Sequence, residues 1–242
     1  MHYQPKVKLQ SGSIDGVEAL LRWQHPVFGS VSPVEFIPIA EEKGFIHKFG
    51  DWVVKEACLQ WVHWNVKHKI RPVVAVNISP IQLTKDDFYS SLVKILEETN
   101  MDPQYLELEI TESSSFRFEE KTNKVLNQIR NLGIQISLDD FGTGYSSFSV
   151  LKQLPINTLK IDRSFLQNVL GDVEQEAIVR SIIQLGHNLK FQVLMEGVEQ
   201  YEEVEWLKKE NCNYVQGFFY SKPLPPTEVL PLLKQSRIEF VQ

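Results

Sequence analysis

Short apolar runs alternate with helix-like segments along most of the chain. The runs are rich in Val, Ile, Leu and aromatic residues, which is typical of strands buried on both faces. They cover residues 73–78, 106–110, 134–138, 158–161, 192–195 and 214–220. Between them, apolar residues at helical spacing predict amphipathic helices at 86–98, 119–132 and 175–189.

The start of the chain has a different pattern. Runs at 3–9 and 16–23 predict a strand pair joined by the polar turn 10–15, and helices are predicted at 33–43 and 50–66. About eight strands alternating with helices favour an α/β TIM-like (β/α)8 barrel with an irregular, antiparallel first strand. An open doubly wound sheet is the alternative, but no Gly-rich phosphate loop follows a strand. One domain, 1–242, is expected, since such barrels commonly have about 250 residues.

Polar or acidic residues end nearly every predicted strand, although the apolar runs do not require them. In a barrel these strand ends converge on one mouth, where the loops build the active site. The residues expected to face one another there are Glu18, Asn77, Glu109, Asp139, Asp140 and Glu196. Lys160 lies inside an apolar run, so it is expected to have a buried partner, because buried lysine is rare without one.

This set of residues predicts a site for divalent cations. Oxygen ligands without His or Cys favour Mg²⁺ or Mn²⁺ over zinc. The adjacent Asp139 and Asp140 could hold two ions at the separation of about 3.5–4 Å that two-metal phosphoryl chemistry uses. Each acid alone could equally be a helix N-cap or a turn residue. Five acids and Asn77 at one end of one barrel favour a site that hydrolyses phosphate esters.

Composition excludes several other classes of function. The net charge of −6 argues against sequence-independent binding of DNA or RNA, which needs a basic surface. No stretch approaches the roughly 18 apolar residues of a membrane helix, and no secretory signal is present, so we expect a cytoplasmic domain without membrane contact. Cys58 and Cys212 are too few for a disulfide framework. His63 and His68 are five apart on a predicted helix, and we expect them not to share a face.

A series of short motifs follows in order along the chain. They are Tyr3-Gln4-Pro5, Glu18-Ala19-Leu20-Leu21-Arg22, Val76-Asn77-Ile78, Glu109-Ile110-Thr111-Glu112, Asp139-Asp140-Phe141-Gly142, Leu159-Lys160-Ile161-Asp162, Glu196-Gly197-Val198-Glu199 and Gln216-Gly217. Together they resemble the signature of the EAL family of cyclic di-GMP phosphodiesterases over almost the whole chain.

The resemblance implies hydrolysis of cyclic di-GMP to linear pGpG by water, with two ions of Mg²⁺ or Mn²⁺. The implied metal ligands are Glu18, Asn77, Glu109, Asp139, Asp140 and Glu196. The implied catalytic residues are Lys160, Glu196, Glu199 and Asp140. Substrate contacts are implied for Gln4, Leu20, Arg22, Asn77 and Gln216, and Glu112 is implied as the anchor of the loop 141–147.

The resemblance also implies a homodimer through residues 142–154, and a place in a longer signalling protein with sensory or GGDEF domains upstream. The alternative is a degenerate EAL domain that binds cyclic di-GMP, or a partner protein, without cleavage. Such relatives have lost a metal ligand or the loop acid, and this chain keeps all of them.

Overall fold

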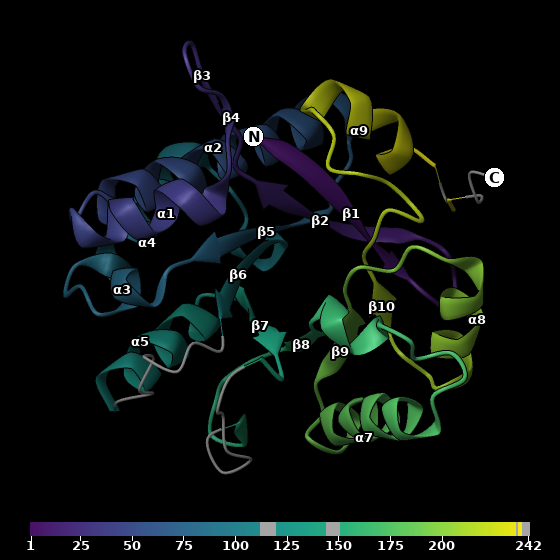
Figure 1. Ribbon diagram of the computed structural model, residues 1–242. Helices are drawn as coiled ribbons and strands as arrows, with labels where there is room; N and C mark the ends of the chain where they lie inside the picture. Colours follow the sequence, from purple (N-terminus) through teal and green to yellow (C-terminus); the bar gives the residue numbers. More distant parts are fainter. Residues whose placement is uncertain (112–119, 144–150, 236, 239–242) are drawn as a thin grey trace.

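The barrel predicted from the alternating pattern is present. The structure, a computed structural model, describes residues 1–111, 120–143, 151–235 and 237–238. Its strands close in the order β1-β10-β9-β8-β7-β6-β5-β2 (Figure 1). The barrel strands are β1 His2–Lys8, β2 Ile14–Leu20, β5 Val73–Ile78, β6 Leu106–Thr111, β7 Gln135–Phe141, β8 Thr158–Ile161, β9 Gln192–Met195 and β10 Tyr214–Val215.

Strand β1 closes the barrel and is antiparallel to both of its neighbours, β2 and β10, as expected. A short turn joins β1 to β2, and a connection that short can only return the chain in the opposite direction. The other neighbouring strands are parallel. Tyr3 on β1 also exchanges two backbone hydrogen bonds with Leu224, with N–O distances of 2.7 and 2.9 Å. The first strand is thereby tied to the segment that follows the last barrel strand.

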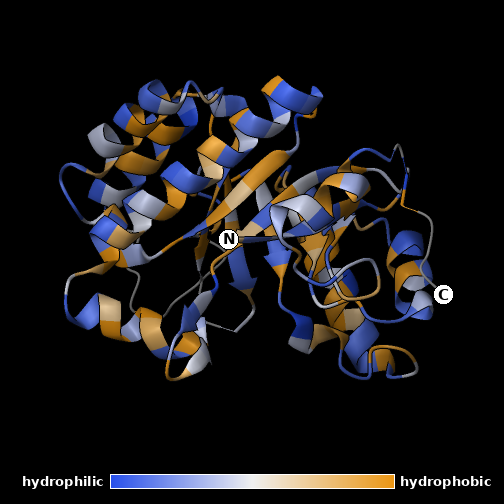
Figure 2. Ribbon diagram, turned by 90° about the horizontal axis from the view of Figure 1, so that it is seen from above, coloured by the Kyte–Doolittle hydropathy of each residue, from blue (hydrophilic) through white to orange (hydrophobic). Residues whose placement is uncertain are grey.

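Helices surround the barrel (Figure 1), and hydrophobic and hydrophilic residues alternate along their ribbons (Figure 2). Leu126 and Ile129 on α5, and Val179 and Ile183 on α7, are almost completely buried. The helices are α1 Pro33–Glu42, α2 Ile46–His68, α3 Pro80–Leu83, α4 Phe88–Thr99, α5 Glu120–Asn131, α7 Val173–Asn188, α8 Tyr201–Lys209 and α9 Pro226–Leu233, with 3₁₀ turns at Pro103–Tyr105 and Arg163–Leu166.

Several predicted boundaries are wrong. Strand β2 ends at Leu20, and the following residues form a separate hairpin of β3 Trp23–His25 and β4 Gly29–Val31. The run 214–220 is a strand only over Tyr214–Val215. Beyond it, the backbone of Gly217 packs so closely on Val198 that a Cβ atom would lie 2.0 Å from the Val198 carbonyl oxygen. The chain turns there, and the aromatic residues that follow mimic a strand only in composition.

The expectation for His63 and His68 is also wrong, since their rings lie 6.1 Å apart in an edge-to-face arrangement near the end of α2. Helix α2 ends there, with Lys69 in the left-handed region at φ 61°. In the described part of the chain, no helix has both the length and the apolar character needed to cross a membrane.

Candidate metal centre at the barrel mouth

The acidic strand ends converge as the sequence predicts. In register, Glu18 on β2 lies beside Ala75, and Asn77 on β5 lies beside Glu109 on β6. The Asn77 amide donates a hydrogen bond of 2.7 Å from Nδ2 to Glu18 Oε1. Glu18, Glu109 and Asp139 are buried. Three neighbouring strands therefore bring one amide and two carboxylates to a common point, with Asp139 on the next strand.

Lys160 on β8 lies at the centre of these carboxylates. Its Nζ is 2.9 Å from Glu109 Oε2, 2.9 Å from Asp139 Oδ1 and 2.8 Å from Glu196 Oε1, with Glu18 Oε2 at 3.9 Å. The side chain is completely buried. The prediction of a buried partner for this lysine is confirmed, and the partner is a cage of acids that an ammonium group neutralises in part.

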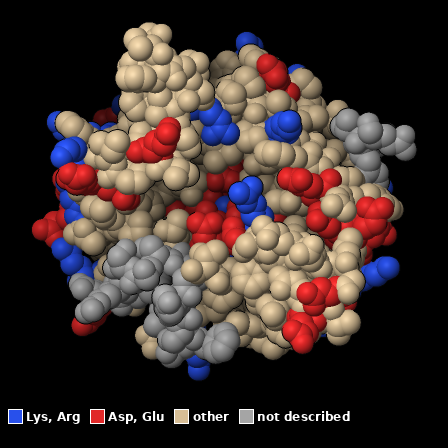
Figure 3. Space-filling view, viewed as in Figure 1, with Lys and Arg blue, Asp and Glu red and all other residues tan. Residues whose placement is uncertain are grey.

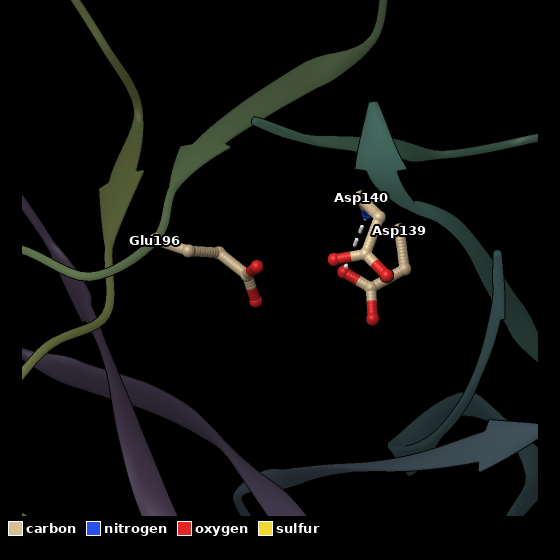
Figure 4. A group of neighbouring side chains, drawn as sticks. All are labelled: Asp139, Asp140 and Glu196. Carbon is tan, nitrogen blue, oxygen red and sulfur yellow. Dashed lines mark hydrogen bonds between the residues drawn. The ribbon is translucent and has the colours of Figure 1, made fainter. Parts of the chain in front are cut away.

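Asp139, Asp140 and Glu196 form a group that could hold a metal ion. One carboxylate oxygen from each lies within 4.8 Å of the others, and Figure 4 shows Asp139 and Asp140 at the end of β7 opposite Glu196, which follows β9. Figure 3 shows acidic atoms gathered in a hollow at the centre of this face. This donor set consists of hard oxygen ligands, which fits Mg²⁺ or Mn²⁺.

A local irregularity lets neighbouring aspartates serve one site. Consecutive side chains of a regular strand point to opposite faces of the sheet. Between β7 and β8, however, the register passes from Leu138 beside Leu159 to Phe141 beside Ile161, so β7 contains one extra residue. Asp140 has φ 54°, in the left-handed region that aspartate tolerates better than most residues. Because of this β-bulge, the carboxylates of both aspartates reach the mouth.

Two glutamines complete the rim opposite β7. Gln216 Nε2 donates to Glu18 Oε2 at 2.6 Å and to Gln4 Oε1 at 3.1 Å, and Gln4 Nε2 donates to the Ser221 carbonyl at 3.0 Å. Gln216 Oε1 is buried and has no hydrogen-bond partner among the described residues. Buried polar atoms almost always have a partner, so this oxygen is an acceptor that the described residues leave unused.

A cavity of about 300 Å³ opens above the carboxylates. Its lining residues are Gln4, Glu18, Leu20, Asp140, Asp162, Arg163, Glu196, Gly197, Glu199, Gln216, Gly217 and Phe218. A neighbouring hollow of about 320 Å³ shares Leu20 and is lined by Arg22 and Asn77, among others. The predicted substrate-binding residues thus border two adjoining hollows. Glu112, the predicted loop anchor, lies outside the described residues.

Burial and crowding disfavour the ionised forms of several of these acids. Burial, reinforced by neighbouring carboxylates and opposed by Lys160, raises the pKa of Glu18 to about 7 and that of Glu196 to about 8. Burial also raises the pKa values of Asp139 and Asp140. Without added cations, the centre therefore retains protons near neutral pH.

Glu109 behaves in the opposite way. Burial would raise its pKa, but the charges of Lys160 and Lys6 and their hydrogen bonds outweigh burial and lower the pKa to about 2. Burial would lower the pKa of Lys160, yet Asp139 and the other surrounding carboxylates raise it well above its usual range. Glu109 and Lys160 are therefore charged over the whole physiological pH range.

Sequence reasoning missed two charged residues inside the barrel, Lys6 and Glu107. Lys6 Nζ contacts Glu107 Oε2 at 2.8 Å and Glu109 Oε1 at 2.7 Å. The sequence contained a signal for Glu107. Side chains two residues apart on a strand lie on the same face, so Glu107 must share the face of Glu109. Lys6 likewise lies between the apolar residues Pro5 and Val7 in the buried part of β1.

Comparison with known families agrees with this geometry: the model of the EAL domain matches residues 1–223. The chain belongs to the EAL family. This EAL domain is 41% identical to the bifunctional diguanylate cyclase/cyclic di-GMP phosphodiesterase MucR of Pseudomonas aeruginosa, over 95% of the chain and 34% of MucR. It is 36% identical to the cyclic di-GMP phosphodiesterase PA2567 of the same organism, over 96% of the chain and 40% of that relative. The domain thus spans well under half the length of these curated relatives.

Solved structures show the same architecture. The MucR phosphodiesterase in complex with c-di-GMP has a TM-score of 0.88 and 41% identity, covering 94% of this EAL domain and 92% of that chain. The EAL domain of DcpA from Mycobacterium smegmatis has a TM-score of 0.81 and 32% identity, covering 98% and 96%.

Proposed function

We propose that this EAL domain hydrolyses cyclic di-GMP to linear pGpG with two divalent cations, Mg²⁺ or Mn²⁺. The observation that carries the proposal is the cage of carboxylates around Lys160, placed beneath a cavity at the barrel mouth. The printed names of MucR and PA2567 as cyclic di-GMP phosphodiesterases, and the c-di-GMP complex of the MucR domain, support the same substrate.

The charges inside the barrel support two divalent ions. The lysines are Lys6 and Lys160, and the carboxylates are Glu18, Glu107, Glu109, Asp139, Asp140 and Glu196. With every group ionised, four negative charges are left without a compensating lysine. Two divalent cations would supply four positive charges and neutralise the centre, so that an anionic dinucleotide can approach.

The roles of individual residues follow from their places. Glu18, Asn77, Glu109 and Asp139 would hold one ion, while Asp139, Asp140 and Glu196 would hold the other. When bound, the ions polarise the scissile phosphodiester and lower the pKa of the attacking water. Lys160 would stabilise anionic oxygens by its charge.

Other proposed contacts concern the dinucleotide. Gln4, Leu20, Arg22, Asn77 and Gln216 line the adjoining hollows and would position it. Glu199, exposed at the rim, would help to orient water.

The proposal also covers oligomeric state, the loop near the metal centre, additional domains and cellular location. The homodimer expected through residues 142–154, the anchoring of the loop by Glu112 and the upstream domains come from the family resemblance. A cytoplasmic location is supported by Cys58 and Cys212, which are both free and buried.

The proposal is tested by incubating the purified protein with cyclic di-GMP and Mg²⁺ or Mn²⁺, and separating products by chromatography. Conversion to pGpG is expected. Replacing Glu18 by Ala should abolish it, because one ion loses a charged ligand, whereas Lys8→Met, at an exposed residue, should not. Binding without product under both metals would contradict hydrolysis and favour the receptor alternative.

A further inference from the structure

The carboxylate of Glu109 is held from both sides by lysines. Its Oε2 atom is 2.9 Å from Lys160 Nζ, and its Oε1 atom is 2.7 Å from Lys6 Nζ. Lys6 is itself fixed by Glu107 Oε2 at 2.8 Å. The four side chains are at most 6% exposed. Negative and positive groups therefore alternate along the barrel interior, from Glu107 to the metal centre.

Strand geometry explains how this row of charges forms. Glu107 and Glu109 share the inner face of β6 because they are two residues apart. Lys6 extends from β1 into the same interior. Gly16 lies beside Lys6 in register, and Ala75 lies beside Glu107. Because β2 and β5 separate β1 from β6 in the barrel order, the lysine side chain crosses the interior to reach Glu107 and Glu109.

Lys6 lies on the far side of Glu109 from the substrate cavity. It lines a separate cavity of about 80 Å³ at the opposite end of the barrel, together with Asp15, Glu107 and Tyr214. It does not line the cavity above the metal centre. The contact through which Lys6 reaches the metal centre is therefore the one with Glu109.

We propose that Lys6 is a positioning residue for the metal centre. By holding Glu109 Oε1, its ammonium group fixes the rotation of the carboxylate and leaves Oε2 directed at the mouth. Partners that orient a metal-ligating side chain typically change metal affinity or activity by about 10–100-fold when they are removed. The inference rests on the proposed function only in taking Glu109 as a metal ligand.

A purely structural role for Lys6 would be to neutralise Glu107. The two roles separate in a double variant. Lys6→Met alone leaves Glu107 buried without a cation, a condition that often destabilises a protein strongly. Lys6→Met combined with Glu107→Gln removes that unpaired charge, yet Glu109 still lacks its orienting contact. Lys8→Met, on the same strand but exposed, is the matched control.

The experiment measures Mn²⁺ affinity by isothermal titration calorimetry on the parent and on the three variants. Catalytic turnover at increasing Mn²⁺ concentration is measured in parallel. We expect Lys6→Met and the double variant to weaken Mn²⁺ binding about 10–100-fold. Excess Mn²⁺ should restore most of the turnover, because Lys6 does not touch the substrate. Lys8→Met should bind Mn²⁺ like the parent.

The proposal is overturned if the double variant binds Mn²⁺ as the parent does, since Lys6 would then serve only Glu107. It is also overturned if the parent does not bind Mn²⁺. If Lys6→Met does not fold, the double variant decides between the two roles. If the parent binds Mn²⁺ but produces no pGpG, the proposed function fails, while the affinities still test the role of Lys6.

Discussion

Lys160 lies where a bound cation would be expected, among Glu109, Asp139 and Glu196. Its charge lowers the repulsion between carboxylates that desolvation makes severe. In the absence of divalent ions, the stability of the barrel mouth should therefore depend on this one side chain.

Replacing Lys160 by Met should lower the free energy of unfolding of the metal-free protein by about 3–5 kcal/mol, the usual cost of removing one partner from a buried ion pair. Saturating Mn²⁺ should reduce this loss, because the ions take over the neutralisation. Urea denaturation measures the free energy of unfolding in EDTA and in Mn²⁺. Lys8→Met is the control. An equal loss under the two conditions would contradict the idea.

The pKa values predict how stability depends on pH. Glu18 and Glu196 have folded pKa values of about 7 and 8, above the unfolded value of 4.5. The folded state therefore binds more protons, and stability should fall as the pH rises from about 4.5 through 8. Glu109 has the opposite sign, but its contribution is complete above pH 4.5 and is lost only as the pH falls towards 2.

Metal ions should remove this dependence, because they bind the ionised carboxylates. We expect the rise in melting temperature on adding Mn²⁺ to be larger at pH 8 than at pH 6. Calorimetric melting scans with EDTA or Mn²⁺ at the two pH values provide the comparison. An equal rise at the two pH values, or a larger one at pH 6, would contradict protonation of these acids in the metal-free protein.

At the residue scale, the sequence predicted most of the site. Glu18, Asn77, Glu109, Asp139, Asp140 and Glu196 stand at strand ends where an apolar run does not require them, and the structure brings them together. Lys6 was not predicted, because its partner Glu107 comes from a strand about a hundred residues away. Pairing across a barrel depends on register, which short-range periodicity does not reveal.

At the scale of elements, the strands were the easiest features to predict and their ends were the hardest. The run after β10 illustrates the difficulty, since Phe218 and Phe219 have high strand propensity but lie in a turn that begins at Gly217. Close packing of two backbones forces that turn, and no local propensity encodes such packing. The bulge at Asp140 was missed for the same reason.

Gly217→Ala should therefore destabilise the protein by about 1–3 kcal/mol, as overpacking typically does. The added methyl group would meet the backbone of Val198, which cannot move as a side chain can. Because Gln216 is the adjacent residue, Mn²⁺ affinity should also fall. Ser221→Ala, where the hydroxyl bonds only the Lys222 carbonyl among the described residues, is the control in denaturation and in calorimetry. An unchanged free energy of unfolding for Gly217→Ala would show that the backbones at Gly217 and Val198 can move apart.

At the scale of the whole molecule, helix α9 belongs to the barrel although the family match ends at residue 223. Val229 on α9 is completely buried, and Leu230 and Leu233 pack against the main core. The sequence analysis did not predict α9, whose two prolines weaken the helical signal.

Val229→Ala should lower the free energy of unfolding by about 2 kcal/mol, from the lost burial and the cavity left behind. Val173→Ala, at a position 79% exposed, should change it by less than about 0.5 kcal/mol. Chemical denaturation measures the difference. Equal effects of the two substitutions would mean that α9 contributes little to the folded barrel.

The bonds between Tyr3 and Leu224 have a mechanical consequence. Strand β1, which closes the barrel by pairing with β10, is held at Tyr3 by Leu224 as well. Gln4, the residue after Tyr3, accepts a hydrogen bond from Gln216 at the barrel mouth. A small rotation of β1 at Tyr3 would therefore move the neighbouring Gln4, and with it Gln216 beside Glu18. Such a rotation, although too small to open the barrel, would change the geometry around the Glu18 carboxylate.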